Sequence, residues 1–395
     1  MSASPRSDAA ADSAERERIA LISSSYAPAI GGVEETVRRL ASGLRSQGHA
    51  VEVWTVDRAG SSSMASIDGI TVRYLPAPLP ASSPGAVARF SASAPRAWRE
   101  WTRSFRSFQP TIAHVHCFGP NGLYTLALSR RHGTPLILTS HGETIADDGG
   151  AFCRSAILRF GLRRAVARAV EVTAPSGVVL EDLASNYGLR GGMVIPNGVD
   201  LSIAGTPPGD SEPYLFAVGR LGRMKGFDLL VEAFAAADLD SSVRLVIGGD
   251  GPERAQIEAR VEELGIASRV ELRGWMPPVA VADAMAGSSA VVVPSRMEAF
   301  GLVALEAWRS GAPLVMTRHG GAGGFMRDGE DAVLIDPEDT SAFAATLRRV
   351  LDDAALRRRL AAAGRVRVGD FGWDGVVAQY SRLYADVAHG DARAS

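Results

Sequence analysis

Lysine is almost missing from this chain. Of its 42 basic residues, one is lysine, Lys225, and all the others are arginine. In a chain that uses arginine wherever either cation would serve, a position that keeps lysine is expected to need a compact, mobile ammonium group. Lys225 is therefore a candidate functional residue; the alternative is a surface lysine without a role.

Cysteines and long apolar runs are also scarce. Cys117 and Cys153 are too few for a disulfide framework and match no metal-site spacing. No uncharged apolar window of about 18 residues occurs, so no transmembrane helix is expected. Residues 1–17 lack the apolar core of a secretory signal and are expected to form a disordered tail. We therefore expect a cytoplasmic protein.

The charges are spread unevenly over the 395 residues. Residues 1–200 carry 21 arginines and 17 acids, net +4, and the remainder carries 21 basic residues and 27 acids, net −6, which together give −2. The basic half would suit an anionic acceptor or a membrane surface, but we favour chance scatter at this magnitude. No nucleic-acid partner is expected.

Strand-like and helix-like segments alternate along both halves of the chain. The pattern begins with a buried strand at 18–26 and restarts at 214–221, after a Gly/Pro-rich stretch at 196–208. Such alternation predicts parallel sheets, and one sheet of so many strands is improbable. The fold class is therefore α/β, with two Rossmann-like β/α/β domains facing across a cleft, at 18–200 and 201–372, and a final helix at 373–388. Residues 76–96 are Pro/Ser-rich and predict a long loop before a helix.

Ligands of open parallel sheets bind at the carboxyl ends of the strands, so the loops there are informative. Gly31 and Gly32 follow the first strand and precede a helix, without the GxGxxG spacing of a dinucleotide site. Arg220 and Lys225 lie in a Gly-rich turn that opens a helix, which favours a diphosphate site. Later strand ends add further candidates for the cleft, namely Gly249, Gly251, Arg273 and Trp275.

The stretch SRMEAFGLVALEAWRSGAP at 295–313 places one glutamate before a helix and another within it. The backbone N–H groups of Ala299, Phe300, Gly301 and Leu302 lie at the predicted helix start and could receive an anion. Glu298 and Glu306 would accept hydrogen bonds from vicinal hydroxyls on either side of that anion, while Leu302 and Trp308 face the core. The combination predicts a nucleotide-diphosphate sugar as ligand; an ordinary loop acid and an exposed helix glutamate are the alternative.

These motifs together resemble the GT-B-fold retaining glycosyltransferases of family 4. The resemblance rests on Glu298-x7-Glu306, on GRxxxxKG with Arg220 and Lys225, on the GDGPE turn and on the N-terminal GGVE, and it spans about residues 18–385. It implies an N-terminal acceptor-binding domain, a C-terminal donor-binding domain and a final helix that returns to the first domain. It also implies transfer of a hexose with retained configuration, without a metal or other cofactor, because Arg220 and Lys225 serve at the diphosphate.

The resemblance extends to residues of the first half. His141, in LTSHGE, matches the family's histidine near the anomeric carbon, and His116 and Ser176 match two further family positions. The implied mechanism is front-face substitution, in which a phosphate oxygen takes the acceptor proton and Glu298 positions the donor. We expect His114 and His116 on opposite faces of their strand, which argues against a histidine metal site. One departure is the stretch 318–326, RHGGAGGFM, which is unusually rich in glycine.

The sequence leaves the substrates open. A UDP-sugar is favoured as donor from family frequency, with a small-molecule, natural-product or lipid-linked hydroxyl as acceptor. Alternatives are a GDP-mannose-dependent mannosyltransferase acting on a membrane lipid, and a nucleotide-sugar-binding or epimerase protein of the same fold. Two Arg-rich helical segments, 89–108 and 153–170, would allow peripheral contact with the inner face of a membrane, although ordinary surface helices are the favoured interpretation.

Overall fold

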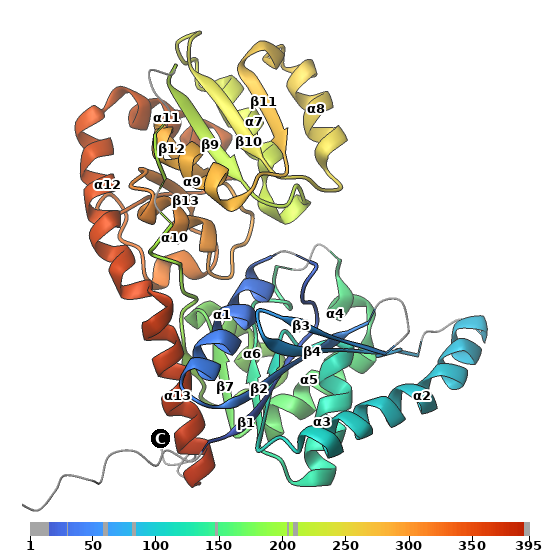
Figure 1. Ribbon diagram of the computed structural model, residues 1–395. Helices are drawn as coiled ribbons and strands as arrows, with labels where there is room; N and C mark the ends of the chain where they lie inside the picture. Colours follow the sequence, from blue (N-terminus) through green and yellow to red (C-terminus); the bar gives the residue numbers. More distant parts are fainter. Residues whose placement is uncertain are drawn as a thin grey trace, which may run out of the picture.

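Two parallel sheets, each covered by helices on both faces, form the molecule (Figure 1). The computed structural model describes residues 16–29, 31–57, 62–80, 84–146, 149–203, 205–207 and 212–390, so the tail predicted at 1–17 lies almost wholly outside the described residues. This architecture confirms the predicted α/β fold class.

The N-terminal sheet has eight strands in the order β3-β4-β2-β1-β5-β6-β7-β8, and only β3 runs antiparallel to its neighbour. Their bounds are β1 (Arg18–Ser23), β2 (Ala50–Val56), β3 (Ser63–Ile67), β4 (Ile70–Leu75), β5 (Ile112–His116), β6 (Leu136–Thr139), β7 (Glu171–Ala174) and β8 (Met193–Val194). Helices α1 (Gly32–Ser46) and α13 (Trp373–His389) pack on one face of this sheet, and α2 (Pro84–Phe108), α3 (Pro120–His132), α5 (Ala156–Arg168) and α6 (Gly177–Tyr187) on the other.

The C-terminal sheet has six parallel strands in the order β11-β10-β9-β12-β13-β14. Their bounds are β9 (Tyr214–Val218), β10 (Arg244–Gly248), β11 (Val270–Gly274), β12 (Ala290–Val293), β13 (Leu314–Thr317) and β14 (Val333–Ile335). Helices α7 (Phe227–Ala236), α8 (Arg254–Glu263), α11 (Thr340–Asp352) and α12 (Ala354–Arg367) contribute to the core on one face, and α9 (Pro278–Gly287) and α10 (Leu302–Arg309) to the core on the other.

Helix α13 joins the end of the chain to the N-terminal domain. Gly43 of α1 lies so close to it that a Cβ there would overlap the side chain of Val377, and Gly198 meets the ring of Trp373 in the same way. Tyr380 and Tyr384 of α13 are buried in the core that β1 and α1 also form. The last helix is therefore an integral part of the N-terminal core.

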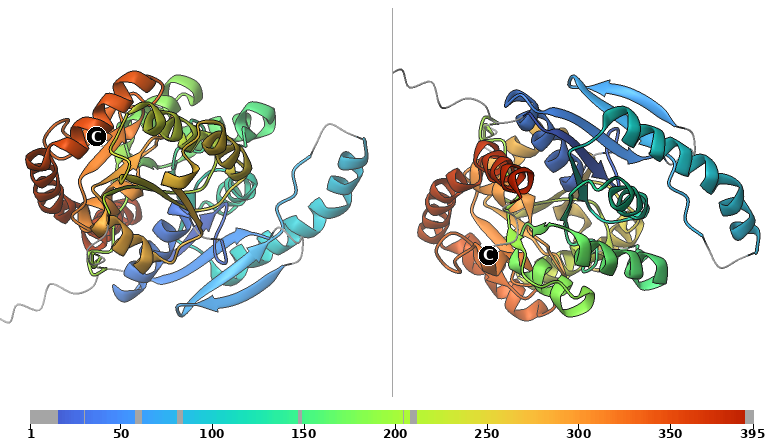
Figure 2. Two further views of the ribbon diagram at one scale, coloured as in Figure 1. Left: turned by 90° about the horizontal axis from the view of Figure 1, so that it is seen from above. Right: turned by 90° about the horizontal axis from the view of Figure 1, so that it is seen from below.

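The loop predicted at 76–96 is wrong from Pro84 onward, because α2 begins there and continues through Pro95 to Phe108. Its second half carries a stripe of buried residues at helical spacing, Ala97, Trp101 and Phe105, which packs against the sheet. The first half has no such stripe, and the helix extends away from the sheet (Figure 2). Sequence composition suggested a loop there because polar Ser and Pro residues mask the good helix formers between them.

The second Arg-rich segment forms α4 (Ala151–Arg154) and α5. Phe160 and Ile157 of α5 are largely exposed, and the Arg164 guanidinium lies 5.2 Å from the centre of the Phe160 ring. Whether either Arg-rich segment touches a membrane stays a prediction. No helix in the described part of the chain is long and apolar enough to cross a bilayer.

Candidate functional site

The loops at the carboxyl edges of the two sheets touch each other. Ser176, which precedes α6, donates its hydroxyl proton to the backbone oxygen of Ala299, 2.6 Å away in the other domain. Gly142 lies against the same residue, so that a Cβ on Gly142 would overlap the Ala299 Cβ. Gly32 faces Leu302 in a similar way, 2.9 Å from the Leu302 Cδ1 to the place of a Cβ. Two predicted site residues of the first half, Gly32 and Ser176, thus meet two of the second, Ala299 and Leu302, at one interface.

Leu302 corrects an expectation. Its side chain was expected in the core with Trp308, but it is only half-buried and reaches Gly32 of the N-terminal domain, whereas Trp308 is fully buried. The reason is helix geometry: Leu302 begins α10 six residues before Trp308, which puts the two side chains about 120° apart around the helix. Leu302 therefore belongs to the contact between the domains.

Lys225 and Glu298 form an ion pair across two loops. Lys225 ends the short 3-10 helix η1 (Arg223–Lys225), and its Nζ lies 2.6 Å from Oε2 of Glu298. The Ser295 hydroxyl donates to the same oxygen at 3.0 Å. An ammonium group has three N–H donors, so Lys225 can hold Glu298 and still bind an oxygen of a ligand. Lys225, the one lysine of the sequence, and Glu298 are therefore direct neighbours.

The N-terminus of α10 begins at Gly301, which has φ +97, a conformation that side-chain-bearing residues rarely adopt. The first N–H groups of a helix have no intrahelical partner and attract anions. Phe300 just before it is buried and stacks on Phe325, with ring centroids 4.7 Å apart. A ligand at this helix start would therefore meet the backbone of Ala299 and Phe300 rather than the Phe300 ring.

Glu306 lies on α10 in a largely buried place. Burial raises the pKa of the Glu306 carboxyl; Arg309 lowers it and Glu35 raises it further. None of the described residues forms a hydrogen bond with the Glu306 carboxyl group. Its capacity to accept hydrogen bonds is thus available to a ligand, as its predicted role requires.

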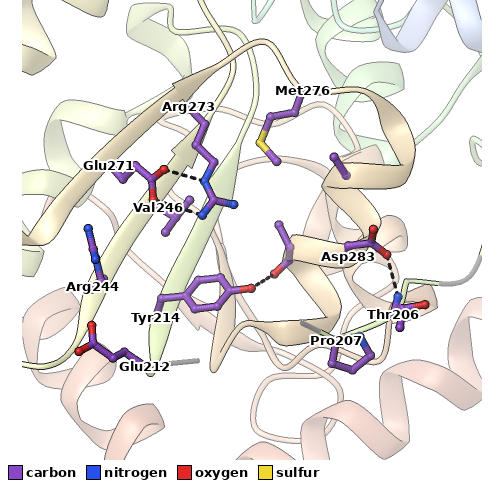
Figure 3. A pocket seen from close by; sticks show the side chains of 12 residues that line it. Thr206, Pro207, Glu212, Tyr214, Arg244, Val246, Glu271, Arg273, Met276 and Asp283 are labelled. Carbon is purple, nitrogen blue, oxygen red and sulfur yellow. Dashed lines mark hydrogen bonds and ion pairs between the residues drawn. The ribbon is translucent and has the colours of Figure 1, made fainter. Parts of the chain in front are cut away.

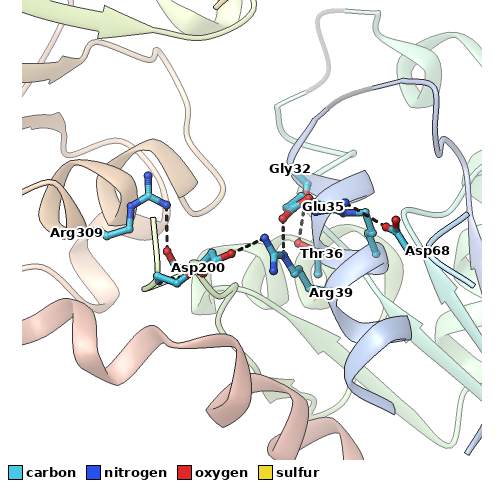
Figure 4. A network of polar contacts seen from close by, with 9 residues as sticks. Gly32, Glu35, Thr36, Arg39, Asp68, Asp200 and Arg309 are labelled. Atoms are coloured by element: carbon cyan, nitrogen blue, oxygen red, sulfur yellow. Dashed lines mark hydrogen bonds and ion pairs between the residues drawn. The ribbon is translucent and has the colours of Figure 1, made fainter. Parts of the chain in front are cut away.

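A polar network links the two domains through Arg39, Asp200 and Arg309 (Figure 4). Arg39 of α1 binds Asp200 at 2.7 Å and Glu35 at 2.7 Å, and Arg309 of α10 donates to the backbone oxygen of Asp200 at 3.2 Å. Along the chain, Asp200 follows the last strand of the N-terminal sheet and precedes the first strand of the C-terminal sheet. Glu35 and Arg39 are four residues apart on one helix, a spacing at which such pairs commonly form, but no local signal in the sequence indicates that Asp200 joins them to Arg309.

Arg220 is exposed and forms no ion pair with any described residue. Gly249 and Gly251 pack on the turn that carries it, because a Cβ on either would overlap the backbone of Gly219 or Leu221. The Leu221 N–H donates to Asp250 at 2.9 Å and thereby fastens the two turns together. The structure therefore supplies a packing reason for glycine at 249 and 251, while their contact with a donor stays a prediction.

The side chains of His114 and His116 lie on the same face of β5, contrary to the expectation from the sequence. His114 and His116 were expected on opposite faces, but their ring centroids lie 4.0 Å apart. The reason is the period of a strand: residues i and i+2 point to the same face. His114 is buried and binds the Tyr384 hydroxyl and Thr139 Oγ1, both at 2.6 Å. His114 thus has the core role that the sequence favoured.

His116 is buried and approaches His141, with its Nδ1 3.1 Å from the His141 Nε2. Burial lowers the pKa of His141 to about 4 and that of His114 to about 3, where His141 adds to the effect. Burial and the two neighbouring histidines hold the pKa of His116 well below its usual range. All three rings are therefore neutral near pH 7.

Glu143 is a site residue that sequence reasoning missed. Its Oε1 accepts the Phe118 N–H at 2.8 Å, and its Oε2 accepts the His141 N–H at 2.8 Å and the Ser140 hydroxyl proton at 2.9 Å. Burial raises the pKa of the Glu143 carboxyl, and these donors, together with its own backbone N–H, oppose that rise. The only sequence signal was an acid two residues after the candidate histidine.

Arg273 lies in a groove on the C-terminal sheet, whereas a role for Trp275 in the cleft stays a prediction. Arg273 forms two hydrogen bonds to Glu271 and lies in a groove of about 640 Å³ on the face of the C-terminal sheet, with Tyr214 and Arg244 (Figure 3). Tyr214 and Arg244 begin β9 and β10, so the groove extends to the amino ends of the strands. Trp275 is 63% exposed, so it is not a core residue. Arg273 is therefore withdrawn as a candidate of the cleft.

Three or more His, Cys, Asp or Glu side chains that could hold one metal ion are not found together within the described ranges.

The glycine-rich stretch after β13, which departs from the family pattern in sequence, forms the 3-10 helix η3 (Gly321–Gly324). Its Gly321 donates to the Glu298 carbonyl at 2.8 Å and lies against Ser176. This stretch supports the Glu298 loop at the contact between the domains.

Comparison with known proteins agrees with this arrangement. Residues 30–203 match the model of Glycosyltransferase Family 4, and residues 201–367 match that of Glycosyl transferases group 1. The D-inositol 3-phosphate glycosyltransferase of Xylanimonas cellulosilytica is 32% identical over 90% of this chain and 91% of its own. The chain belongs to the family 4 glycosyltransferases. It is thus a transferase enzyme, as the resemblance implied.

Other relatives of the family 4 enzyme support the same assignment. The D-inositol 3-phosphate glycosyltransferase 1 of Catenulispora acidiphila is 28% identical over 91% of this chain and 90% of its own. Among solved structures, sucrose-phosphate synthase from Thermosynechococcus elongatus superposes with a TM-score of 0.81 at 24% identity, over 95% of this chain and 100% of that one. The Anabaena protein HepE in complex with UDP and glucose gives 0.73 at 18%, over 93% and 99%. These two likenesses show the GT-B fold.

Proposed function

We propose that this glycosyltransferase moves a hexose from a UDP-sugar to a hydroxyl of a small-molecule acceptor, with retained configuration and without a metal ion. The observation that carries the proposal is the Lys225–Glu298 pair of 2.6 Å beside the N-terminus of α10. A cation and free backbone N–H groups suit the diphosphate, and a carboxylate suits the sugar hydroxyls. The Anabaena neighbour of the same fold binds UDP and glucose, which supports the choice of donor.

In the proposed reaction the bond between the anomeric carbon and the diphosphate oxygen breaks. The acceptor oxygen bonds to that carbon on the same face, and its proton passes to a phosphate oxygen, so UDP leaves with the proton. Lys225, Arg220 and the α10 N-terminus stabilise the charge that develops on the diphosphate. Glu298 and Glu306 hold donor hydroxyls, and neither acts as a nucleophile.

The first acceptor to test is D-inositol 3-phosphate, because the relatives from Xylanimonas and Catenulispora are named for it. It presents several hydroxyls on one ring, which suits a transferase that acts on a small molecule. A lipid-linked or natural-product acceptor is the alternative that an acceptor screen would reveal.

The test of the donor site is calorimetric titration with UDP, GDP and ADP, each with and without EDTA. We expect UDP to bind, EDTA to have no effect, and Lys225→Ala to weaken binding at least tenfold, as loss of a charged contact would. Arg223→Ala is the matched control, because Arg223 is an exposed cation two residues away. Binding that prefers GDP, or that requires a divalent ion, would contradict the proposal and favour the mannosyltransferase or another activity.

The test of the reaction is NMR of the product formed from UDP-sugar and D-inositol 3-phosphate. Retention predicts that the new glycosidic bond has the anomeric configuration of the donor. An inverted product would overturn the retaining mechanism, and an altered sugar released without an acceptor would indicate an epimerase.

A further inference from the structure

The ring of His141 is held by a second histidine whose role the proposed reaction does not use. His116 Nδ1 lies 3.1 Å from His141 Nε2, which is a hydrogen bond between two imidazoles. Both rings are neutral near pH 7, because burial lowers the pKa of each. A neutral imidazole has one N–H and one bare nitrogen, so one ring must donate and the other must accept.

The unused nitrogen of His116 decides the direction of this bond. His116 Nε2 is buried, and no described residue offers it a hydrogen-bond partner. If His141 donated, His116 would carry its proton on Nε2, and a buried N–H donor would stay unpaired. If His116 donates, only a lone pair stays without a partner. Among backbone groups, buried N–H donors without a partner are rarer than buried acceptors without one, and the same preference favours His116 as the donor.

We propose that His116 is a positioning residue that fixes His141 in the tautomer protonated on Nδ1, so that His141 offers a hydrogen-bond donor to the cleft. His141 then accepts from His116 at Nε2, and its Nδ1–H has no partner among the described residues. An imidazole in this state cannot take a proton from an acceptor hydroxyl through Nδ1. Its part is to donate to an oxygen of a bound sugar, and that part rests on the proposed function.

The surroundings hold both ends of the pair. The backbone N–H of His141 donates to Glu143, which fixes the loop that carries the ring. On the other side, the His116 ring packs on His114, which the Tyr384 hydroxyl of α13 holds at 2.6 Å. The returning helix thus supports the imidazole pair from the far side of the core. Because both rings are held in place, the hydrogen bond between them can fix a single tautomer of His141.

The experiment is NMR of the full chain labelled with ¹⁵N-histidine, which reports the protonation of each ring nitrogen near neutral pH. The chain has seven histidines, and the signals of His141 and His116 are assigned from their loss in His141→Asn and in the His116 variants. We expect a protonated Nδ1 and a bare Nε2 at His141. A protonated Nε2 at His141 in the wild-type protein would overturn the proposal without any variant.

Two variants of His116 test its part. In His116→Leu the hydrogen bond that selects one tautomer is gone, and we expect His141 to populate the Nε2-protonated form alongside the Nδ1-protonated one. In His116→Asn an amide N–H replaces Nδ1–H, and we expect the wild-type tautomer to return. Thr55→Val is the matched control, because Thr55 is a buried residue of β2 at the same sheet edge and its hydroxyl has no partner among the described residues. A His141 that stays Nδ1-protonated in His116→Leu, or that shifts equally in Thr55→Val, would contradict the proposal.

Substrate measurements separate this proposal from the proposed function. With UDP-sugar and D-inositol 3-phosphate, His116→Leu is expected to lower kcat about tenfold or more while the affinity for UDP, which the other domain binds, stays unchanged. If these substrates fail in the wild-type protein, the NMR result still decides the tautomer. A loss of UDP affinity in His116→Leu equal to the loss of turnover would indicate general disruption and count against a positioning role.

Discussion

The Lys225 ammonium and the Glu298 carboxylate, 73 residues apart in the chain, lie 2.6 Å from each other at the start of α10. In the proposed function this ion pair keeps the cation beside the donor diphosphate, and it orients the Glu298 carboxylate in the absence of a ligand. The two groups nevertheless oppose each other toward an anionic ligand, since one attracts the phosphates and the other repels them. Their separate effects are therefore measurable by substitution.

Replacing Glu298 by Gln should separate binding from turnover. The change removes a negative charge beside the diphosphate, so UDP is expected to bind more tightly, by about 1 kcal/mol or roughly fivefold. Turnover of UDP-sugar is expected to fall about tenfold or more, because the amide is a weaker partner for sugar hydroxyls. Calorimetry with UDP and a coupled assay of UDP release measure the two effects, and Glu330→Gln, at an exposed position far along the chain, is the control. Weaker binding of UDP would show that Glu298 does not face the phosphates.

The contact of Gly142 with Ala299 predicts a variant that impairs domain closure. Gly142 has φ +91, and a Cβ there would overlap Ala299, so Gly142→Ala combines backbone strain of about 1–2 kcal/mol with a clash between the domains. If the proposed function holds, UDP binding to the C-terminal domain persists, whereas turnover falls roughly tenfold because the arrangement in which the two domains touch is less populated. Small-angle scattering with UDP should show a larger radius of gyration than in the wild-type protein. Gly177→Ala is the control, because a Cβ on Gly177 would meet no other group within 4 Å.

We expect the substitution Glu143→Gln to lower both the stability of the protein and its turnover. Both oxygens of the carboxylate accept hydrogen bonds, so an amide NH2 would face a donor of Phe118, Ser140 or His141. A buried donor left unpaired costs about 1–3 kcal/mol, which lowers the thermal midpoint of the N-terminal domain by roughly 5 °C. Glu181→Gln, at an exposed position of α6, should leave the midpoint unchanged. An unchanged midpoint in Glu143→Gln would mean that the loop is not held by this carboxylate.

Sequence patterns predicted the fold well, because alternating strands and helices follow from local periodicity. The strand ends then indicated candidate residues, and the contact between the domains contains three of them, Gly32, Ser176 and Ala299. That a ligand binds there stays a prediction. The helix α2 was missed in its first half because no buried stripe marks it there. Local patterns thus predict elements whose faces are buried and fail for those that are exposed.

Relationships across long sequence separations could not be predicted. The distance from Lys225 to Glu298 depends on the pairing of β9 with β12 within the C-terminal sheet, and the bridge from Arg39 through Asp200 to Arg309 depends on how the two domains meet. No local spacing encodes either relationship. Arg273 was misplaced because its position near a strand end says nothing about which face of the sheet its side chain joins. The histidine pair of β5 differs: the strand period already places residues 114 and 116 on one face, so that error lay in the reasoning and not in the sequence.

The histidine cluster predicts how stability depends on pH. Burial lowers the pKa of His141 from 6.5 to about 4, so between these pH values an unfolded chain binds a proton there that the folded chain does not. The free energy of unfolding therefore falls as pH decreases from about 6.5 to about 4, and His114 extends the fall to about 3. In His141→Asn the slope should be smaller by about one proton over that window, or about 1.4 kcal/mol per pH unit. Chemical unfolding of both proteins at a series of pH values measures this, and the carboxylates cancel in the difference because both chains contain them. Parallel curves for the two proteins would show that His141 is not a buried neutral group in the folded enzyme.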